Sequence, residues 1–424
     1  MKLSRRNYLT CVGVSALGGC SALETNCEVS ITPDSITGWP TQRRGSKNTA
    51  SVEPPGVRGT GTLSRDWRLT IDGEVRGAVA TAEIAVVASS GIVGGESVAT
   101  LHAISLNSGA EIWKRSFKKD DDGNLSVSHP IIVGENVFVS ATRSATDTNA
   151  SVVVAVSIRD GTVSWKKTFD SFTLSMAAPW LLLGRTDPQS GYIALHPETG
   201  TKCWMYKPWR QGFLRTGGEE QVAGYPAIAD ETIVTVVSKD PDHYLAGVNP
   251  QNGQEKWRTK MTREPPKLAA PSVIEGSVLV PTEHRVWAHN LEDGQLAWKT
   301  AQIRDTSLTF MAANQSTIVV TGTSLHVIDR QSKTKRWTIE EGGRPIIAGR
   351  TVYIPTAKKT GDGEYTNFLH TINAHSGEIV GEYPLTGSMR TRPLIAGGKL
   401  VLAMDGDDGE NAVRSVTIEA VSRS

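Results

Sequence analysis

The 424-residue chain contains four cysteines, at positions 11, 20, 27 and 203. No two are adjacent and none form a Cys-x-x-Cys pair, so the sequence predicts neither a zinc-ligand set nor a haem-attachment site. Outside the cell, Cys27 and Cys203 can form a disulfide, provided that their Cα atoms approach within about 4.4–6.8 Å. Two free or buried thiols explain the spacing equally well, and both interpretations stay open at this stage.

The N-terminus has the composition of an export signal. Lys2, Arg5 and Arg6 precede an apolar stretch of about a dozen residues, which is shorter than the ~20 residues that span a bilayer. The run from Ser4 to Leu9 resembles the twin-arginine export motif, and Leu17–Cys20 resembles a lipobox. We therefore predict a signal peptide over residues 1–19, lipidation of Cys20, and a tether with an extended segment over residues 20–60. The alternative is an ordinary cleaved signal with an incidental cysteine.

Other reactive side chains do not form a recognisable site. The acidic stretches 118–124 and 404–411 lack the alternating ligand spacing and closing Glu of a calcium loop. His102, His326 and His370 recur at one repeat position beside a leucine, which indicates a structural register. The formal net charge of +1 gives no reason to expect a nucleic-acid partner. We therefore predict no catalytic residue and no metal site.

The elements that would position any site come from an internal repeat. A Gly-x-x-x-Trp phrase or a degenerate copy of it returns at intervals of about 45 residues, a period typical of propellers. A short apolar strand precedes each glycine, and the glycine supplies the positive φ of a hairpin turn. We expect the tryptophans to fill the wedges between neighbouring blades. These residues are Trp67, Trp113, Trp165, Trp204, Trp257, Trp298 and Trp337.

Each repeat unit predicts four strands and no helix, which is one blade of a propeller. The C-terminal region supplies only three strands, whereas the segment around Trp67 is a strand without its preceding hairpin. Pairing these two regions closes the last blade. We therefore predict an all-β, eight-bladed propeller over residues 61–421. Seven blades is the alternative, if the degenerate region around Trp337 and Gly381 merges with a neighbour.

The loops that precede the strand-opening prolines are the candidate binding face. Repeat logic brings these loops together on one face around the central axis, and loops carry function more often than strands. Aromatic residues and arginine are enriched in protein-recognition surfaces. Plain loop variation with solvated cations is the alternative explanation. The candidate residues are His129, Tyr225, Lys267, Arg344, Arg390 and Arg392.

The repeat resembles that of quinoprotein-like eight-bladed propellers. The phrase Ala-x-(Asp/Asn)-x-x-(Ser/Thr/Asp)-Gly-x-x-x-Trp is carried by residues 103–113, 155–165, 194–204 and 288–298, with weaker copies elsewhere. The family includes PQQ-dependent alcohol dehydrogenases and the non-catalytic lipoprotein scaffold of the outer-membrane barrel-assembly machine. The dehydrogenases carry adjacent cysteines and a calcium-binding Glu/Asn/Asp set that find no match here. The resemblance therefore implies a propeller without PQQ, calcium or another cofactor.

These observations predict a non-catalytic propeller that acts as a protein-interaction scaffold or ligand-binding module. We expect a monomer, exported and lipid-anchored to the outer face of the cytoplasmic membrane of a prokaryote, with protein partners at the cell surface. A PQQ-dependent dehydrogenase is the alternative function, and a ligand-binding sensor is the third.

Overall fold

The computed structural model describes Cys27 and a set of segments that covers most of the chain from residue 38 onward. These segments are residues 38–53, 57, 62–93, 96–118, 124–144, 150–170, 172–177, 181–185, 191–208, 221–239, 242–261, 270–304, 308–359, 365–389, 391–406 and 415–423. Within them the chain forms β-strands and no helix. None of the described residues therefore belongs to a helix long and apolar enough to cross a membrane.

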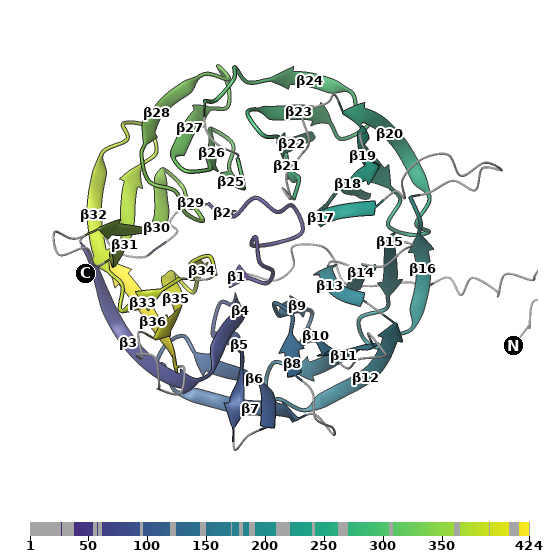
Figure 1. The fold of residues 1–424 in the computed structure, drawn as a ribbon, viewed down its shortest axis with the longest axis vertical. Helices are drawn as coiled ribbons and strands as arrows, with labels where there is room; N and C mark the ends of the chain where they lie inside the picture. The colour runs from purple at the N-terminus through teal and green to yellow at the C-terminus, as the bar shows by residue number, and fades with distance from the viewer. Residues whose placement is uncertain are drawn as a thin grey trace, which may run out of the picture.

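The described strands form eight sheets, numbered here along the chain and arranged in a ring (Figure 1). Sheet 1 consists of β1 (Gly38–Trp39), β4 (Glu74–Thr81), β5 (Ile84–Val93), β6 (Glu96–Ser105) and β7 (Glu111–Lys118). Sheet 2 consists of β8 (Asn124–Val127), β9 (Ile131–Val133), β10 (Asn136–Ser144), β11 (Ala150–Ser157) and β12 (Val163–Asp170). Sheet 3 consists of β13 (Phe172–Ala177), β14 (Leu181–Arg185), β15 (Gly191–Leu195) and β16 (Lys202–Tyr206). Sheet 4 consists of β17 (Gln221–Ala229), β18 (Thr232–Lys239), β19 (Asp242–Val248) and β20 (Glu255–Met261).

The other half of the ring repeats this pattern. Sheet 5 consists of β21 (Ser272–Ile274), β22 (Ser277–Pro281), β23 (Val286–Asn290) and β24 (Leu296–Lys299). Sheet 6 consists of β25 (Phe310–Ala313), β26 (Thr317–Thr321), β27 (Leu325–Asp329) and β28 (Lys335–Ile339). Sheet 7 consists of β2 (Ser51–Val52), β29 (Ile346–Ala348), β30 (Thr351–Lys359), β31 (Tyr365–Asn373) and β32 (Ile379–Pro384). Sheet 8 consists of β3 (Leu63–Asp72), β33 (Gly387–Ser388), β34 (Leu394–Ala396), β35 (Lys399–Gly406) and β36 (Ser415–Arg423).

The ring is closed by strands from the two ends of the chain. β3 pairs antiparallel with β36, from Leu63 opposite Arg423 to Asp72 opposite Ser415. This pairing, together with the ring of antiparallel sheets, confirms the predicted all-β propeller and its mode of closure. Trp337 lies on β28 and Gly381 on β32, in different sheets, so the merger on which the seven-blade alternative depended does not occur.

The middle strands are apolar on both faces because each sheet is covered by two neighbours. On β5, Val87 packs in the cluster that contains Leu400 of sheet 8, whereas Val86 packs in the cluster that contains Val137 of sheet 2. Successive side chains of a strand point to opposite faces. The core is therefore a series of apolar layers between sheets.

The tryptophans fasten neighbouring sheets from the rim of the ring. The Nε1 atom of Trp113 on β7 donates to the Ile158 carbonyl in the turn of sheet 2, at 2.8 Å. The corresponding bonds join Trp67 to Leu106, Trp165 to Pro197, Trp204 to Pro250, Trp257 to Leu291 and Trp337 to Ala374. Most of these indoles are half-buried. The indoles therefore lie between neighbouring blades, as expected, on the outermost strand of one sheet and over a turn of the next.

The repeated glycine packs against the indole ring of the preceding repeat. Gly161 has φ = +72°, and a Cβ added there would lie 2.8 Å from the Trp113 ring. One turn has Lys333 instead of glycine, at φ = +64°, and its ammonium lies 5.7 Å from the Trp298 ring centroid. Gly381 stands where a tryptophan would, beside sheet 8. There β36 and β3 come from opposite ends of the chain, so no turn exists to receive an indole.

The segment that precedes the propeller repeats lies across the centre of the ring (Figure 1). We call residues 38–53 the central segment. β1 and β2 of this segment join sheets 1 and 7. Between them, backbone carbonyls accept bonds from inner-strand amides of sheets 2, 4, 5, 6 and 7. These pairs are Pro40 with Ile132, Ser46 with Ile228, Lys47 with Val273, Thr49 with Ala313, and Ala50 with Ile347. The packed unit therefore extends N-terminal to the predicted boundary at residue 61.

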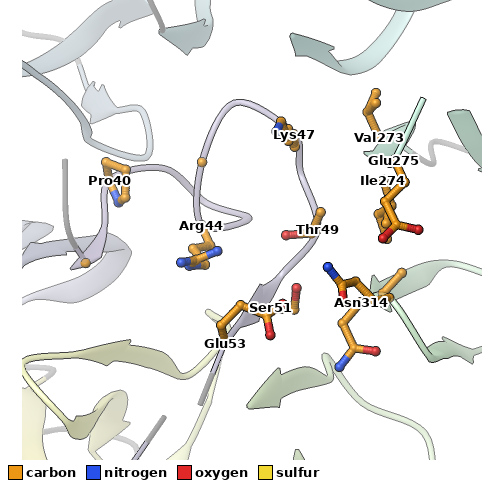
Figure 2. Close-up of a pocket in the computed structure, with 14 residues that line it drawn as sticks. Pro40, Arg44, Lys47, Thr49, Ser51, Glu53, Val273, Ile274, Glu275 and Asn314 are labelled. Carbon is orange, nitrogen blue, oxygen red and sulfur yellow. The ribbon is translucent and has the colours of Figure 1, made fainter. Parts of the chain in front are cut away.

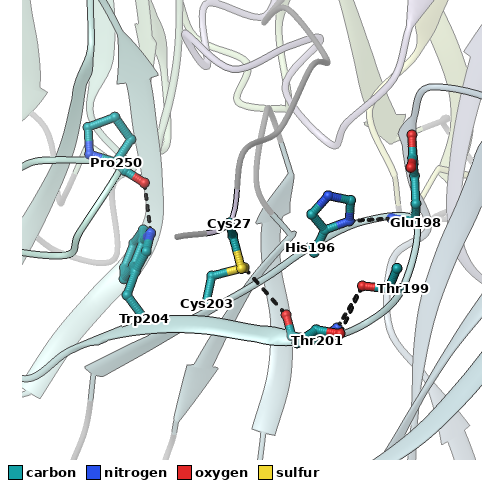
Figure 3. Close-up of a disulfide and its surroundings, with 8 residues drawn as sticks. All are labelled: Cys27, His196, Glu198, Thr199, Thr201, Cys203, Trp204 and Pro250. Carbon is teal, nitrogen blue, oxygen red and sulfur yellow. Dashed lines mark hydrogen bonds between the residues drawn. A yellow bond between two sulfur atoms is a disulfide. The ribbon is translucent and has the colours of Figure 1, made fainter. Parts of the chain in front are cut away.

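The structure contains a disulfide between Cys27 and Cys203, with the Cα atoms 5.6 Å apart. Cys203 lies on β16, next to Trp204, at the rim of sheet 3 (Figure 3). The disulfide alternative is thus the one that the structure adopts, and it links Cys27 to the rim. Arg5, Arg6 and Cys20 lie outside the described residues.

Candidate functional site

The inner strands of the ring define two ends of the central axis. In each repeat, the chain passes from the rim of one sheet into the inner strand of the next sheet, and from there to the second strand of that sheet. All inner strands therefore begin at one end of the axis, the loop end, and finish at the other, the turn end. Among the described candidates, His129, Arg344 and Arg392 come before β9, β29 and β34, whereas Tyr225 lies within β17, where its pairing with β18 shifts register. All four lie on the loop-end side of the residues that finish these inner strands.

The structure brings four of the six predicted residues together. Burial lowers the pKa of His129 to about 4, and the positive charge of Arg344 lowers it as well. The same charge opposes the burial that raises the pKa of Tyr225. Arg392 is also near enough to Arg344 for the two charges to interact. The other two candidates, Lys267 and Arg390, lie outside the described residues.

Phe310, at the start of β25, lies against two residues of this group and was missed in the sequence. The guanidinium of Arg344 lies 5.1 Å from the Phe310 ring centroid, and that of Arg392 lies 5.5 Å from it. Arg392 also donates to the Pro345 carbonyl at 2.5 Å. Cation–π contacts of this kind need no acidic partner, which lets two arginines share one site.

Arg43 of the central segment is the second missed residue. Its guanidinium is buried and donates to the Ala270 carbonyl (2.6 Å), the Ser272 hydroxyl (3.0 Å) and the Met311 carbonyl (2.9 Å). Burial lowers its pKa to about 10. Burial also lowers the pKa of Arg392 far below its usual range, and the charges of Arg43 and Arg344 add to that effect. We call Arg43, His129, Arg344 and Arg392 the axial basic cluster.

The central segment directs Arg43 toward the axial basic cluster and its neighbour Arg44 toward the turn end. Arg44 adopts φ = +70° and Asn48 adopts φ = +55°, a conformation that asparagine tolerates better than most residues. The Asn48 amide donates to the Pro226 carbonyl at 2.8 Å, and the Ser272 hydroxyl donates to the Asn48 carbonyl at 2.8 Å. These bonds hold the sharp path of the segment.

At the turn end, a pocket of about 280 Å³ lies between the central segment and the turns of sheets 5 and 6 (Figure 2). Its lining carries both charges, from Arg44, Lys47, Glu53 and Glu275. Glu275 also pairs with Arg330 at 2.7 Å. The pocket is therefore polar and nearly balanced in charge, unlike the axial basic cluster.

Two of the recurring histidines contact side chains of their own sheets, since His102 lies 2.7 Å from Glu111 and His326 lies 3.0 Å from Thr338. His370 lies 3.1 Å from Glu382 of its own sheet and also 3.1 Å from Glu341, which precedes β29. In the described part of the chain, no three His, Cys, Asp or Glu side chains are grouped so that they could hold a metal ion.

The ring of sheets, the Trp–Gly seams and the central segment define a PQQ-repeat β-propeller. The family described as outer membrane protein assembly factor BamB matches residues 60–206 and 186–364, more than half of the chain. The chain therefore belongs to that family. No curated protein sequence matches it.

Solved structures with the same fold include both branches of the predicted resemblance. BamB from Moraxella catarrhalis is 12% identical, with a TM-score of 0.56 over 84% of this chain and 99% of its own. The quinohemoprotein alcohol dehydrogenase from Comamonas testosteroni is 13% identical, with a TM-score of 0.63 over 91% of this chain and 80% of its own. The corresponding enzyme ADHIIG from Pseudomonas putida is 11% identical, with a TM-score of 0.65 over 91% and 80%. At these identities the likeness shows the fold alone.

Proposed function

We propose that this chain is a non-catalytic scaffold that binds protein partners at the cell envelope through the loop end of its propeller. Membership of the BamB family supports an assembly role at the envelope. The scaffold acts as a monomer, because one chain closes its own ring. We further propose that the chain is exported through the motif that contains Arg5 and Arg6. Cys20 is then lipidated at the outer face of a prokaryotic cytoplasmic membrane.

The observation that carries this proposal is the composition of the loop end. Tyr225, Phe310 and Arg344 are all partly exposed there, around an axis that the central segment holds rigid. Aromatic rings and arginine are the side chains that most often dominate the binding energy of protein interfaces. A preformed surface also loses little conformational entropy on binding.

Site-specific crosslinking tests which end of the axis binds a partner. Thr309 and Gln315 are both exposed and flank the same inner strand β25, Thr309 at the loop end and Gln315 at the turn end. A photoreactive residue at position 309 should give one reproducible crosslinked protein in intact cells, and the same residue at position 315 should give none. Crosslinks only from position 315, or from neither position, would contradict the proposed binding end.

The lipid anchor has its own test. Mass spectrometry of the mature protein should find a diacylglyceryl-modified Cys20 at its N-terminus, and Cys20→Ser should release the protein from the membrane fraction. Arg5→Lys with Arg6→Lys should leave the precursor inside the cell. A mature N-terminus at any other residue would end the lipoprotein proposal.

A quinone-dependent dehydrogenase is the second candidate, supported by the similarity in fold to the two alcohol dehydrogenases. The arginines of the axial basic cluster suit the carboxylates of such a cofactor, whereas the described residues offer no carboxylate cluster for its calcium ion. Incubation with PQQ and calcium, followed by a dye-linked assay with alcohols and sugars, distinguishes the two. Turnover would replace the scaffold proposal with the enzymatic one.

A further inference from the structure

The axial basic cluster concentrates positive charge in a poorly solvated place. The two guanidinium groups that flank Phe310 and the buried guanidinium of Arg43 come from sheets 7 and 8 and from the central segment. The hydrogen-bond acceptors of Arg43 are two carbonyls and a hydroxyl, and that of Arg392 is a carbonyl. None of these acceptors carries a charge. Buried cations are costly unless an anion compensates them.

The cluster also contains polar atoms that have no partner within the described structure. The Arg43 Nε atom and the Thr391 hydroxyl are buried without a hydrogen bond, and Thr391 adjoins Arg392 in the loop that leads into β34. Buried donors are nearly always satisfied in native proteins, by protein, water or ligand. Both groups could donate to an added acceptor.

We propose that the loop end of the axis is a binding site for a small oxyanion, a molecule that carries carboxylate or phosphate groups. Guanidinium groups bind both groups through paired, charge-assisted hydrogen bonds. Arg344 and Phe310 are only half-buried, so the cluster is reachable from the loop end. Arg344 is the entrance residue of the site, and Arg392 with Arg43 forms its floor.

The site has an electrostatic consequence that favours anions over neutral ligands. The charges of Arg43 and Arg344 disfavour the protonated form of Arg392, and the charge of Arg344 disfavours protonated His129. An anion would relieve both repulsions at once. The proposal does not depend on a protein partner, because purified protein and a small anion are sufficient to test it.

The test is isothermal titration of the purified mature chain with inorganic phosphate in one arm and citrate in the other, at constant ionic strength set with chloride. Oxyanions also stabilise proteins generally by exclusion from the surface, so thermal shifts alone would not decide. Saturable, 1:1 heats are the expected result. Tighter phosphate binding identifies a phosphate-bearing ligand, and tighter citrate binding identifies a polycarboxylate.

Variants localise the binding. Arg344→Gln should weaken the tighter anion by at least about tenfold, since it removes a charge-assisted contact. Arg344→Lys, which keeps the charge and loses the planar fork, should have intermediate affinity. Arg159 is highly exposed (73%) and lies in the turn between β11 and β12, at the turn end. The Arg159→Gln variant should bind the anion as the wild type does. The absence of saturable heats in both arms, or equal affinity of wild type and Arg344→Gln, would overturn the proposal.

The two proposals fail separately. If the titration shows no anion binding while position 309 still crosslinks a protein, the oxyanion site is wrong and the scaffold stands. If anion binding depends on Arg344 while no protein crosslinks, the propeller is a small-molecule binding module instead.

Discussion

The two ends of the inner strands differ in how their charges are arranged. At the turn end, two cations and two carboxylates line the pocket, and Arg330 pairs with Glu275. At the loop end, Arg344 and Arg392 share one phenylalanine, and Arg43 lies close enough to act on Arg392. The turn end also contains the Trp–Gly contacts that fasten the sheets. The difference supports the proposal that the loop end binds a ligand, whereas the turn end stabilises the ring.

The largest expected effect concerns the turn end. Gly294→Ala should lower the free energy of unfolding by about 3 kcal/mol, since a Cβ there would lie 2.3 Å from the Trp257 ring in addition to the cost of φ = +72°. Gly276→Ala is the matched control in the same sheet, with φ = +70° and no atom within 4 Å, and should cost about 1 kcal/mol. Denaturant midpoints measure both. Equal losses would mean that the contact between Gly294 and the Trp257 ring does not stabilise the packing of the two sheets.

The next effect concerns acid and the loop end. The folded-state pKa of His129 is about 4, below the ~6.5 of an unfolded histidine. Between these values the unfolded chain binds the proton and the folded chain does not, so stability falls as the pH drops from 6.5 to 4. His129→Gln should reduce this loss by about 2 kcal/mol.

Unfolding of the wild type and His129→Gln at pH 7 and pH 4.5 isolates this contribution. Other histidines with lowered pKa values, such as His102 and His289, are common to both proteins and cancel in the comparison. The same pH dependence in the two proteins would show that His129 is protonated without penalty in the folded state.

The smallest effect has opposite signs at the two ends. Without an oxyanion, Arg392→Met should raise the free energy of unfolding by about 1 kcal/mol, because it removes a buried cation that other cations repel. Arg330→Met at the turn end should lower it by about 1 kcal/mol, since Arg330 bonds to Glu275, Gln315 and Ile274. Urea denaturation measures both. A loss of stability in both variants would contradict the proposed difference, in which cations repel each other at the loop end and charges are paired at the turn end.

Much of the fold could be predicted because the repeat carries its own geometry. The positive φ of Gly109 and Gly161 and the pairing of the Trp67 strand with the C-terminal strand follow from local turn chemistry and from counting strands. The turn that each indole covers could not be predicted, because it lies in the next repeat and depends on how two sheets pack together. The loss of tryptophan at Gly381 is explained only by the missing turn in sheet 8.

The candidate site was predictable only in part. Repeat position alone grouped His129, Tyr225, Arg344 and Arg392, since loops at equivalent positions meet at the axis. Phe310 gave no signal, because a single phenylalanine before an apolar strand is typical of core packing. Arg43 lies in a segment without a periodic apolar pattern, which was predicted only as an extended segment. Its contacts are with Ala270, Ser272 and Met311, which no sequence spacing relates to it.

Anomalous diffraction from crystals grown with tungstate tests the division between the two ends most directly. Tungstate is an oxyanion with strong anomalous scattering, and both ends offer it cations. The account predicts one strong peak at the loop end, within hydrogen-bond distance of the Arg344 and Arg392 guanidinium groups. A peak beside Arg44 and Lys47 in the turn-end pocket, with none at the loop end, would contradict it.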